Sequence, residues 1–217
     1  TNIEPIDKIP SLDIDFEKIN SNTDSFTWLW HSSFIFSVDN KKILIDPVFA
    51  TNISPVSFVW INRYSTTKDI YKDLVDKLPN IDAVLITHDH YDHLDYKTML
   101  KLKDKVKHFY VPLWVWNHLE KWWIDENKIT QLNWDENILL DTIKLTLTTS
   151  RHFSWRLFDR NSTLWWWWII KWSKNNFYIS WDWWYWPHFK DIWNKYWPFD
   201  ATFIEWAQYN PRWANIH

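Results

Sequence analysis

The chain has 217 residues, enough for one full domain with a hydrophobic core and short for two. Its formal net charge of −3 argues against nucleic-acid binding through a broad basic surface. No apolar run approaches the roughly 20 residues that span a bilayer, and the N-terminal segment lacks the basic and apolar regions of a signal peptide. We therefore expect a protein that is cytoplasmic or peripheral to a membrane, with secretion of a processed precursor as the open alternative.

The composition is unusual in two residue types. Glycine is absent and tryptophan occurs 22 times, whereas ordinary chains contain about 7% glycine. Several tryptophans lie among His, Ser, Asp, Asn and Pro, where chains turn and glycine is common. We interpret many of them as occupying positions shaped for glycine, where a side chain costs about 1–2 kcal/mol. This interpretation predicts positive φ at Trp30, Trp60, Trp181 and Trp184.

The first 24 residues are polar and are predicted to form an extended or loosely docked N-terminal arm (1–24). The remainder, 25–217, is predicted to form one domain, because no linker or repeat divides it. This domain begins with a predicted β-hairpin, in which the apolar runs 34–38 and 43–45 flank a polar turn.

Helices and strands then alternate along the chain. A helical stripe over 66–78 precedes a short buried strand at 83–86, which runs directly into His88. Further helices are predicted at 95–106, 115–122 and 188–196, and further strands at 108–112, 143–148, 166–171, 177–181 and 201–205. This alternation predicts the α/β class with a mixed sheet.

One short segment concentrates groups that bind metals. Residues 88–93, with the sequence HDHYDH, provide three imidazoles and two carboxylates directly after a buried strand. His88 and His90 can converge on one cation, whereas Asp92 and His93 lie beyond a turn and can serve a second. Imidazole with carboxylate suits zinc, and also iron or manganese. Because the whole chain has only nine histidines, this spacing predicts a metal site rather than a chance polar loop.

The His-x-His-x-Asp-His pattern resembles that of the metallo-β-lactamase superfamily. Neighbouring segments narrow the resemblance to the branch similar to the N-acylphosphatidylethanolamine-hydrolysing phospholipase D, and they cover 28–217 almost continuously. The matching segments are WLWHSSF (28–34), ILIDPVF (43–49), SPVS (54–57), RYS (63–65), 84–95, HFYVP (108–112), RHFS (151–154), SWD (180–182), PFD (198–200) and YNPRW (209–213). The resemblance implies an αββα sandwich with mixed sheets.

The resemblance also implies roles for individual residues. It implies a first metal bound by His88, His90 and His152, a second bound by Asp92 and His93, and a bridge between the two at Asp182. His152 and Asp182 each follow a predicted strand, as His88 does, so we expect three strand ends to meet at one place.

Other polar residues are expected to support the site or to lie away from it. Asp46 ends a predicted strand and is expected to orient a ligand imidazole, with capping of the turn before Pro47 as the alternative. His31 is expected to have a structural or orienting role. His118 and His188 are expected on the exposed faces of helices.

The chain departs from the family pattern at its C-terminal end. The family places a further metal-ligand histidine beyond segment 209–213, and the sequence ends before it, at His217. We predict that the C-terminal part of the domain is missing; completion by a second chain and weak binding of the second metal are the alternatives. His217 matches a family histidine at the rim of the site, and it shares with Asp92 the expected role of handling the catalytic proton.

The resemblance implies a hydrolase that uses two divalent cations, with zinc expected, to direct a metal-bound hydroxide at a phosphodiester or phospholipid-like substrate. The expected partner is a small-molecule or lipid ester, with a membrane surface as a second partner to be tested and no nucleic acid; the oligomeric state is not defined by the sequence. Two alternatives stay open. In the first, the substrate is a lactone or other cyclic ester. In the second, the protein binds metal without turnover, because indoles at Trp181, Trp183 and Trp184 block the site.

Overall fold

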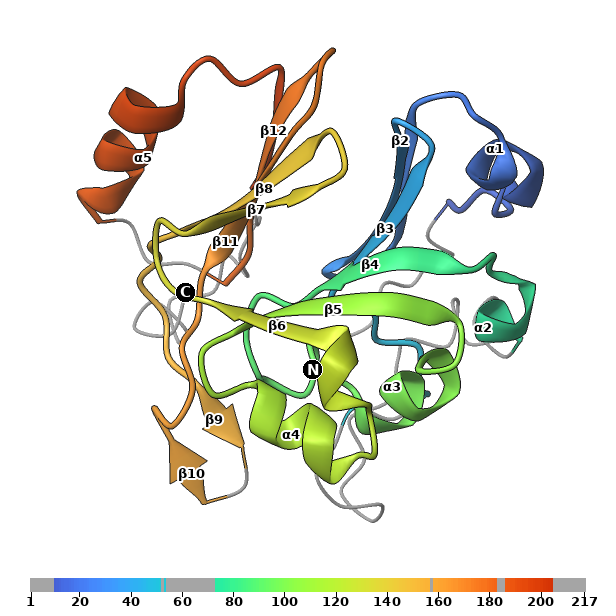
Figure 1. The fold of residues 1–217 in the computed structure, drawn as a ribbon, viewed down its shortest axis with the longest axis horizontal. Helices are drawn as coiled ribbons and strands as arrows, with labels where there is room; N and C mark the ends of the chain where they lie inside the picture. The colour runs from blue at the N-terminus through green and yellow to red at the C-terminus, as the bar shows by residue number, and fades with distance from the viewer. Residues whose placement is uncertain (1–9, 52, 54–72, 157, 183–185, 205–217) are drawn as a thin grey trace.

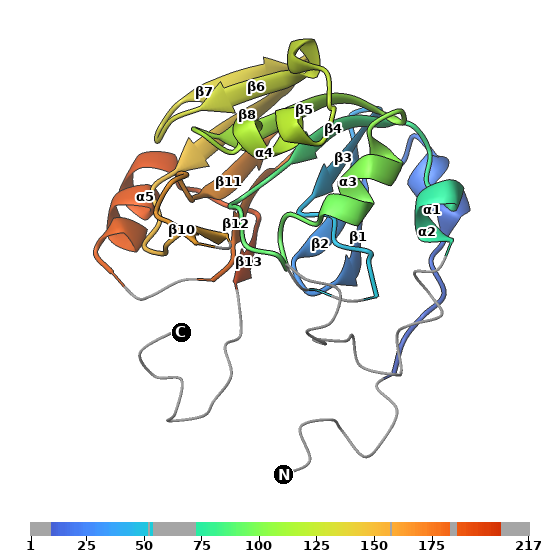
Figure 2. The ribbon, with the colours of Figure 1, turned by 90° about the horizontal axis from the view of Figure 1, so that it is seen from below.

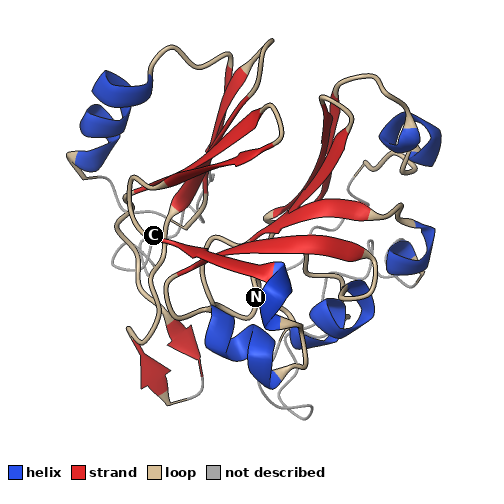
Figure 3. Ribbon diagram, in the orientation of Figure 1, coloured by secondary structure: helices blue, strands red, loops and turns tan. Residues whose placement is uncertain are grey.

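The computed structural model describes residues 10–51, 53, 73–156, 158–182 and 186–204. Two β-sheets face each other, and helices cover their outer faces (Figures 1 and 3). The structure confirms the predicted α/β class with mixed sheets. In the described part of the chain, no helix has the length and apolar character needed to cross a membrane.

The first sheet contains six strands in the order β1-β2-β3-β4-β5-β6. Their bounds are β1 (Ser25–Trp30), β2 (Ser33–Val38), β3 (Lys41–Ile45), β4 (Ile81–Leu85), β5 (Val106–Pro112) and β6 (Ile129–Leu132). The pairs β1–β2 and β2–β3 are antiparallel, whereas β3, β4, β5 and β6 run parallel to one another. The C-terminal ends of β3 and β4 therefore lie side by side, because parallel strands end at the same edge of a sheet.

The second sheet contains five strands in the order β13-β12-β11-β8-β7, and a separate pair is formed by β9 and β10. The bounds are β7 (Asn137–Leu140), β8 (Ile143–Thr148), β9 (Trp155–Arg156), β10 (Asp159–Arg160), β11 (Trp167–Lys171), β12 (Asn176–Ser180) and β13 (Ala201–Ile204). All neighbouring pairs of the five-stranded sheet are antiparallel except β12–β13. Most strands of the two sheets match the predicted ranges, but β1, β6, β7, β9 and β10 were not predicted. Of these, β6, β7, β9 and β10 have only two to four residues each, too few for a clear alternation.

The helices lie on the two outer faces of this sandwich (Figure 2). They are α1 (Phe16–Asn20), α2 (Leu74–Lys77), α3 (Tyr96–Leu102), α4 (Trp116–Lys121), the 3₁₀ helix η3 (Glu126–Lys128) and α5 (His188–Tyr196). Buried side chains of α1 to α4 pack on the first sheet, and Ile192 of α5 packs on the second. Helix α2 lies within the helix predicted at 66–78, and residues 66–72 lie outside the described part of the chain. Helix α1 belongs to the predicted N-terminal arm, where Ile19 is buried against the first sheet.

The main core lies between the sheets and is built by strands with two buried faces. In β3, Ile43 and Ile45 point into this core, while Leu44 packs beneath the helices. In the second sheet, Trp168 joins the core and Trp167 packs against α5. Four consecutive tryptophans stand at 165–168, and the last two are accommodated in β11 because both faces of this strand are covered.

The backbone angles contradict part of the glycine interpretation. Among the described residues with positive φ, neither Trp30 nor Trp181 occurs, so the prediction is wrong at both positions. Trp60 and Trp184 lie outside the described residues. Left-handed tryptophans do occur elsewhere, at Trp114 (φ 75°) and Trp123 (φ 60°). A turn-rich sequence context therefore did not identify which residue of each turn takes positive φ.

Trp123 occupies a position that glycine usually fills. It follows the C-cap of α4, and its N–H donates to the carbonyl of Glu120 at 2.9 Å, while the N–H of Ile124 donates to that of Leu119 at 3.1 Å. These two bonds form a Schellman turn, in which the residue after the cap is left-handed. The Trp123 side chain is 72% exposed and contributes little packing.

Replacing Trp123 with glycine is expected to raise the free energy of unfolding by about 1 kcal/mol, because glycine adopts the left-handed conformation without steric penalty. Urea titration measures the difference. The matched control is Trp193→Gly within α5, where a half-exposed indole leaves a helical position and a loss of about 1 kcal/mol or more is expected. Equal destabilisation by both changes would contradict the argument.

Candidate metal centre

The site is built on the loop that follows β4. Thr87, His88, Asp89 and His93 are all buried there, although each is polar. The N–H of His93 donates to the carbonyl of His90 at 3.1 Å, so the chain turns between the two. This turn separates the loop into an early and a late half, as the sequence predicts.

The first group of potential ligands joins three loops. His88 and His90 follow β4, His152 follows β8 and Asp182 follows β12, and their ligand atoms all lie within 4.8 Å of one another. Nδ1 of His90 lies 3.1 Å from Nε2 of His152. Oδ2 of Asp182 lies 3.3 Å from Nε2 of His88 and 3.7 Å from Nε2 of His152. The three strand ends therefore meet, and the structure places these four residues together as expected.

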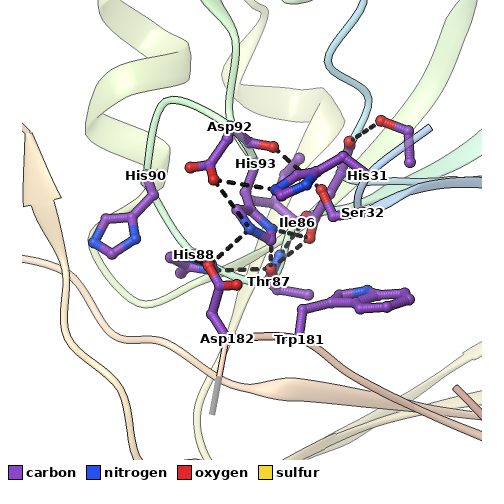
Figure 4. A network of polar contacts seen from close by, with 12 residues as sticks. His31, Ser32, Ile86, Thr87, His88, His90, Asp92, His93, Trp181 and Asp182 are labelled. Carbon is purple, nitrogen blue, oxygen red and sulfur yellow. Dashed lines mark hydrogen bonds and ion pairs between the residues drawn. The ribbon is translucent and has the colours of Figure 1, made fainter. Parts of the chain in front are cut away.

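The second group consists of His31, Asp92 and His93, whose ligand atoms again lie within 4.8 Å of one another. Nε2 of His31 lies 3.1 Å from Oδ2 of Asp92. Nε2 of His93 lies 2.9 Å from Oδ2 of Asp182, the carboxylate that also faces His88 (Figure 4). Asp182 thus touches both groups, which is the arrangement that a bridging ligand requires.

Asp46 fixes the orientation of the His93 ring. Its carboxylate lies at the end of β3, fully buried, and Oδ2 is 2.8 Å from Nδ1 of His93. It also accepts bonds from the N–H of Thr87 at 2.8 Å and from the Thr87 hydroxyl. With Nδ1 engaged, Nε2 of His93 is turned toward Asp182. This is the orienting contact expected for Asp46, since metal-binding imidazoles commonly donate their other N–H to a carboxylate.

Three residues of the centre have left-handed backbones. Positive φ occurs at His31 (49°), Asp46 (39°) and Asp182 (49°). Non-glycine residues in this region are uncommon, although Asp and His are among the more tolerant types. Backbone strain of this kind clusters at functional sites, where the surrounding structure holds it in place.

The carboxylates of Asp182 and Asp92 are held in the ionised form. Burial opposes ionisation of Asp182, but the charge of His93 and the contact with His88 outweigh it and keep the pKa of that carboxyl well below its usual value. Partial burial likewise opposes ionisation of Asp92, and His93 and His31 outweigh it, so the Asp92 pKa is also lowered. Burial lowers the pKa of His93, but Asp182 and Asp92 reverse this effect and raise it well above 6.5, so a cation bound at Nε2 would displace a proton from this ring.

The remaining groups respond mainly to burial. Burial and the neighbouring charge of His93 lower the pKa of His88 well below 6.5, and burial lowers the pKa of His90. Both imidazoles are therefore neutral at pH 7, which is the form that binds a cation. Burial raises the pKa of Asp46 despite its contacts with His93 and Thr87.

The donor set fits divalent cations. Within the described structure, Nε2 of His90 is buried without a hydrogen bond, and Nε2 of His88 and of His93 is buried with no hydrogen bond besides its ion pair with Asp182. Buried polar atoms are normally satisfied, and an unsatisfied one calls for an explanation such as an ion. Converging imidazoles and ionised carboxylates are the ligands that zinc and similar metals prefer. A cation at each group would satisfy these buried ring nitrogens.

Some residues that support the loop were not found from the sequence. His118 was expected on an exposed helix face, but its Nε2 lies 3.4 Å from Oδ2 of the fully buried Asp89. His188 was also expected on an exposed face, but it is buried against Trp167, because the first turn of α5 packs on the second sheet. Helical periodicity did not reveal either contact, since the partners come from distant strands and loops.

Arg156 of β9 holds both ends of the ligand loop. Its Nη1 donates to the carbonyl of Asp89 at 2.6 Å and to that of Leu94 at 2.9 Å. The guanidinium is buried and lies over the rings of Tyr91, at 4.2 Å, and Trp122, at 4.9 Å. A terminal guanidinium nitrogen carries two N–H groups and can bridge two carbonyls in this way, but no sequence pattern around Arg156 indicates it.

Arg156→Met is expected to weaken metal binding by about 10- to 100-fold, the usual range for residues that support ligands. The methionine fills a similar volume but donates no hydrogen bond, so the ligand loop loses its clamp. Competition with a chromogenic zinc chelator measures the affinity. Lys171→Met, at the exposed end of β11, is the control and is expected to bind metal as the unmodified chain does. Equal affinity in both variants would exclude the clamp.

The predicted residue His217 lies outside the described residues. The same holds for Trp183 and for the matching segments 54–57, 63–65 and 209–213. Their predicted roles stay predictions. Trp181 is described, and its indole stacks on Phe34 at 5.1 Å and extends away from the imidazoles (Figure 4).

Comparison with known proteins identifies relatives of this fold and site. The family model for the beta-lactamase superfamily domain matches residues 41–217. The N-acyl-phosphatidylethanolamine-hydrolyzing phospholipase D 1 of Caenorhabditis elegans is 32% identical over 94% of this chain and 60% of its own length. An uncharacterized Mycobacterium bovis protein is 33% identical over 88% of the chain and 50% of its length. A metal-dependent hydrolase of Saccharolobus solfataricus is 33% identical over 58% and 50%.

Solved structures share the fold at low sequence identity. A diiron β-hydroxylase from Streptomyces venezuelae superposes with a TM-score of 0.64 and 16% identity, covering 84% of this chain and 34% of the other. A metallo hydrolase from Ignicoccus hospitalis gives 0.59 and 20%, covering 80% and 66%. The chain spans about half the length of several curated relatives that it matches. The family match covers most of the sequence, and the chain therefore belongs to the β-lactamase superfamily and has the fold of its metal-dependent hydrolases.

Proposed function

We propose that the chain hydrolyses a phosphodiester or phospholipid-like ester with two divalent cations, of which zinc is the expected metal. The observation that carries this proposal is the pair of ligand groups that share Asp182. His88, His90 and His152 would hold the first cation, and Asp92 and His93 the second. The C. elegans relative, whose name gives it a phospholipid substrate, supports the choice of ester.

Two adjacent cations, if bound, would lower the pKa of a bound water and would stabilise the negative charge that develops on an ester oxygen. The protein contributes the positions and charges of the groups around them. His88 and His90 are neutral and buried, and Asp46 holds the His93 ring in one orientation. Asp92 is 38% exposed at its side chain and remains ionised; because Oδ2 would face the cation, the other oxygen of this carboxylate is the proposed acceptor of the proton from the attacking water. His217 is the alternative acceptor.

Hydrolysis of three compounds tests the proposal: bis(p-nitrophenyl) phosphate, vesicles that contain N-acylphosphatidylethanolamine, and a γ-lactone. We expect turnover of a phosphodiester, its loss after treatment with a chelator, and its return on addition of zinc. Faster turnover of the lactone would favour the cyclic-ester alternative. Two bound cations without turnover of any ester would favour a binding protein. Activity that survives complete removal of metal would refute the proposal.

The vesicle arm also tests contact with a membrane surface. A phospholipid substrate places the ester at such a surface, so we expect the chain to bind vesicles peripherally during turnover. Cosedimentation with vesicles, with and without the N-acylated lipid, measures this binding. Hydrolysis of the soluble phosphodiester alone, without vesicle binding, would restrict the substrate to small esters.

A further inference from the structure

The second ligand group contains a histidine whose expected role was structural or orienting. Nε2 of His31 lies 3.1 Å from Oδ2 of Asp92, and this oxygen lies 4.0 Å from Nε2 of His93. Two ligands bound tetrahedrally at zinc–ligand distances of 2.0–2.1 Å are about 3.3 Å apart. The observed separations lie on either side of this value, so one cation can reach all three atoms after small side-chain rotations.

The third member of the group, His93, has one ring nitrogen available for a cation. Nδ1 of His93 is engaged by Asp46, and Nε2 is buried between two carboxylates, 2.9 Å from Oδ2 of Asp182 and 4.0 Å from Oδ2 of Asp92. The ring of His31 lies edge-on to that of His93, with centroids 5.5 Å apart. An imidazole whose outer nitrogen is fixed by a carboxylate has the geometry of a metal ligand.

The position of His31 is fixed by the turn between β1 and β2. Its φ of 49° is left-handed, and its carbonyl accepts a bond from the Trp28 indole at 2.9 Å. The next residue, Ser32, donates from its hydroxyl to the carbonyl of Asp92 at 3.2 Å. The hairpin turn is therefore attached to the ligand loop through both residues, and Figure 4 shows the His31 ring beside Asp92 and His93.

We propose that His31 is a metal ligand and that, together with Asp92 and His93, it holds the second divalent cation. Asp182 is shared between this cation and the first. This inference rests on the proposed function, because it assigns a ligand within the same centre. It makes the N-terminal hairpin part of the metal site. The competing reading is that His31 only orients Asp92 through an ion pair.

Metal content tests whether the second cation depends on His31. The protein is stripped with a chelator, reloaded with zinc, dialysed, and measured by elemental analysis as metal per chain. We expect two cations in the unmodified chain and one in His31→Asn and His31→Gly, both of which tolerate a φ of 49°. His108→Asn is the matched control, since His108 contacts Thr130 away from the centre, and it is expected to bind two.

Cobalt substitution adds a readout that a purely orienting role would not change. In proton NMR of the cobalt protein, coordinated imidazoles show paramagnetically shifted ring N–H signals. At saturating cobalt, the unmodified chain is expected to show one more such signal than His31→Asn. Equal numbers would overturn the ligand role and leave His31 as a residue that acts through Asp92.

The outcomes also separate this inference from the proposed function. Two cations in the unmodified chain and in both variants would overturn the inference and leave the proposed function intact. One cation in the unmodified chain would overturn the inference, because the second site would not be formed. No cation in the unmodified chain would overturn the proposed function itself, and the inference with it.

Discussion

The Asp182→Asn variant is expected to lose ester hydrolysis by about 10²- to 10³-fold, the effect of removing one positioned electrostatic group from an active centre. Oδ2 of Asp182 faces Nε2 of His93 at 2.9 Å, of His88 at 3.3 Å and of His152 at 3.7 Å. An amide is neutral, and its NH₂ group cannot bind a cation. Asparagine also tolerates the φ of 49° at this position, so the backbone is expected to be preserved.

Initial rates on the phosphodiester and metal content per chain, measured in parallel, test this prediction. Asp141→Asn is the matched control: Asp141 is also left-handed (φ 53°), is exposed, and pairs with Lys41 on the surface. We expect the control to retain rate and metal. An Asp182→Asn variant with unmodified rate and two cations would show that the carboxylate is not shared between the metals.

Phe36→Ala is expected to lower the free energy of unfolding by about 3–5 kcal/mol, the range for truncating a buried aromatic residue. Phe36 is fully buried in β2, at the core between the sheets. Its ring centroid lies 5.9 Å from that of Phe177 in β12 and 5.8 Å from that of Phe203 in β13, so it joins the two sheets. Truncation leaves a cavity that both sheets would have to close.

Urea unfolding of the metal-free protein measures this loss, because bound cations would add stability through linkage. Phe158→Ala removes the same atoms from a fully exposed side chain, and a change within about 0.5 kcal/mol is expected. A similar loss in both variants would mean that the effect does not arise from the core. A change in the denaturant slope would indicate an altered unfolded state rather than a cavity.

The elements that the sequence predicted share a strong local signal. The hairpin of β2 and β3, the buried strand β4 and the alternating strand β8 all appear at or near their predicted ranges. Each combines an apolar run with a bounded length, which hydrophobic periodicity detects. The unpredicted strands β9 and β10 have two residues each and exist because the surrounding chain holds them together.

The candidate site likewise has one part that the sequence revealed and another that it did not. The cluster at 88–93 was visible because five ligand-type side chains occur in six residues, and local density is a property of sequence. The side chains that contact His93 and Asp89 were harder to identify from the sequence. Asp46 was anticipated from its place at a strand end, but Arg156 and His118 were not, because each reaches the loop from an element distant in sequence.

The sequence by itself determined the fold class, the family and the ligand-rich loop, since these depend on periodicity and on residue types at short spacing. Only the tertiary structure decided that Asp182 touches two ligand groups and that His31 belongs to the second of them. It also decided which tryptophans are left-handed. The physical reason is that hydrophobic burial fixes the strand order, while contacts between strand ends and turns exist only once the sheets have packed.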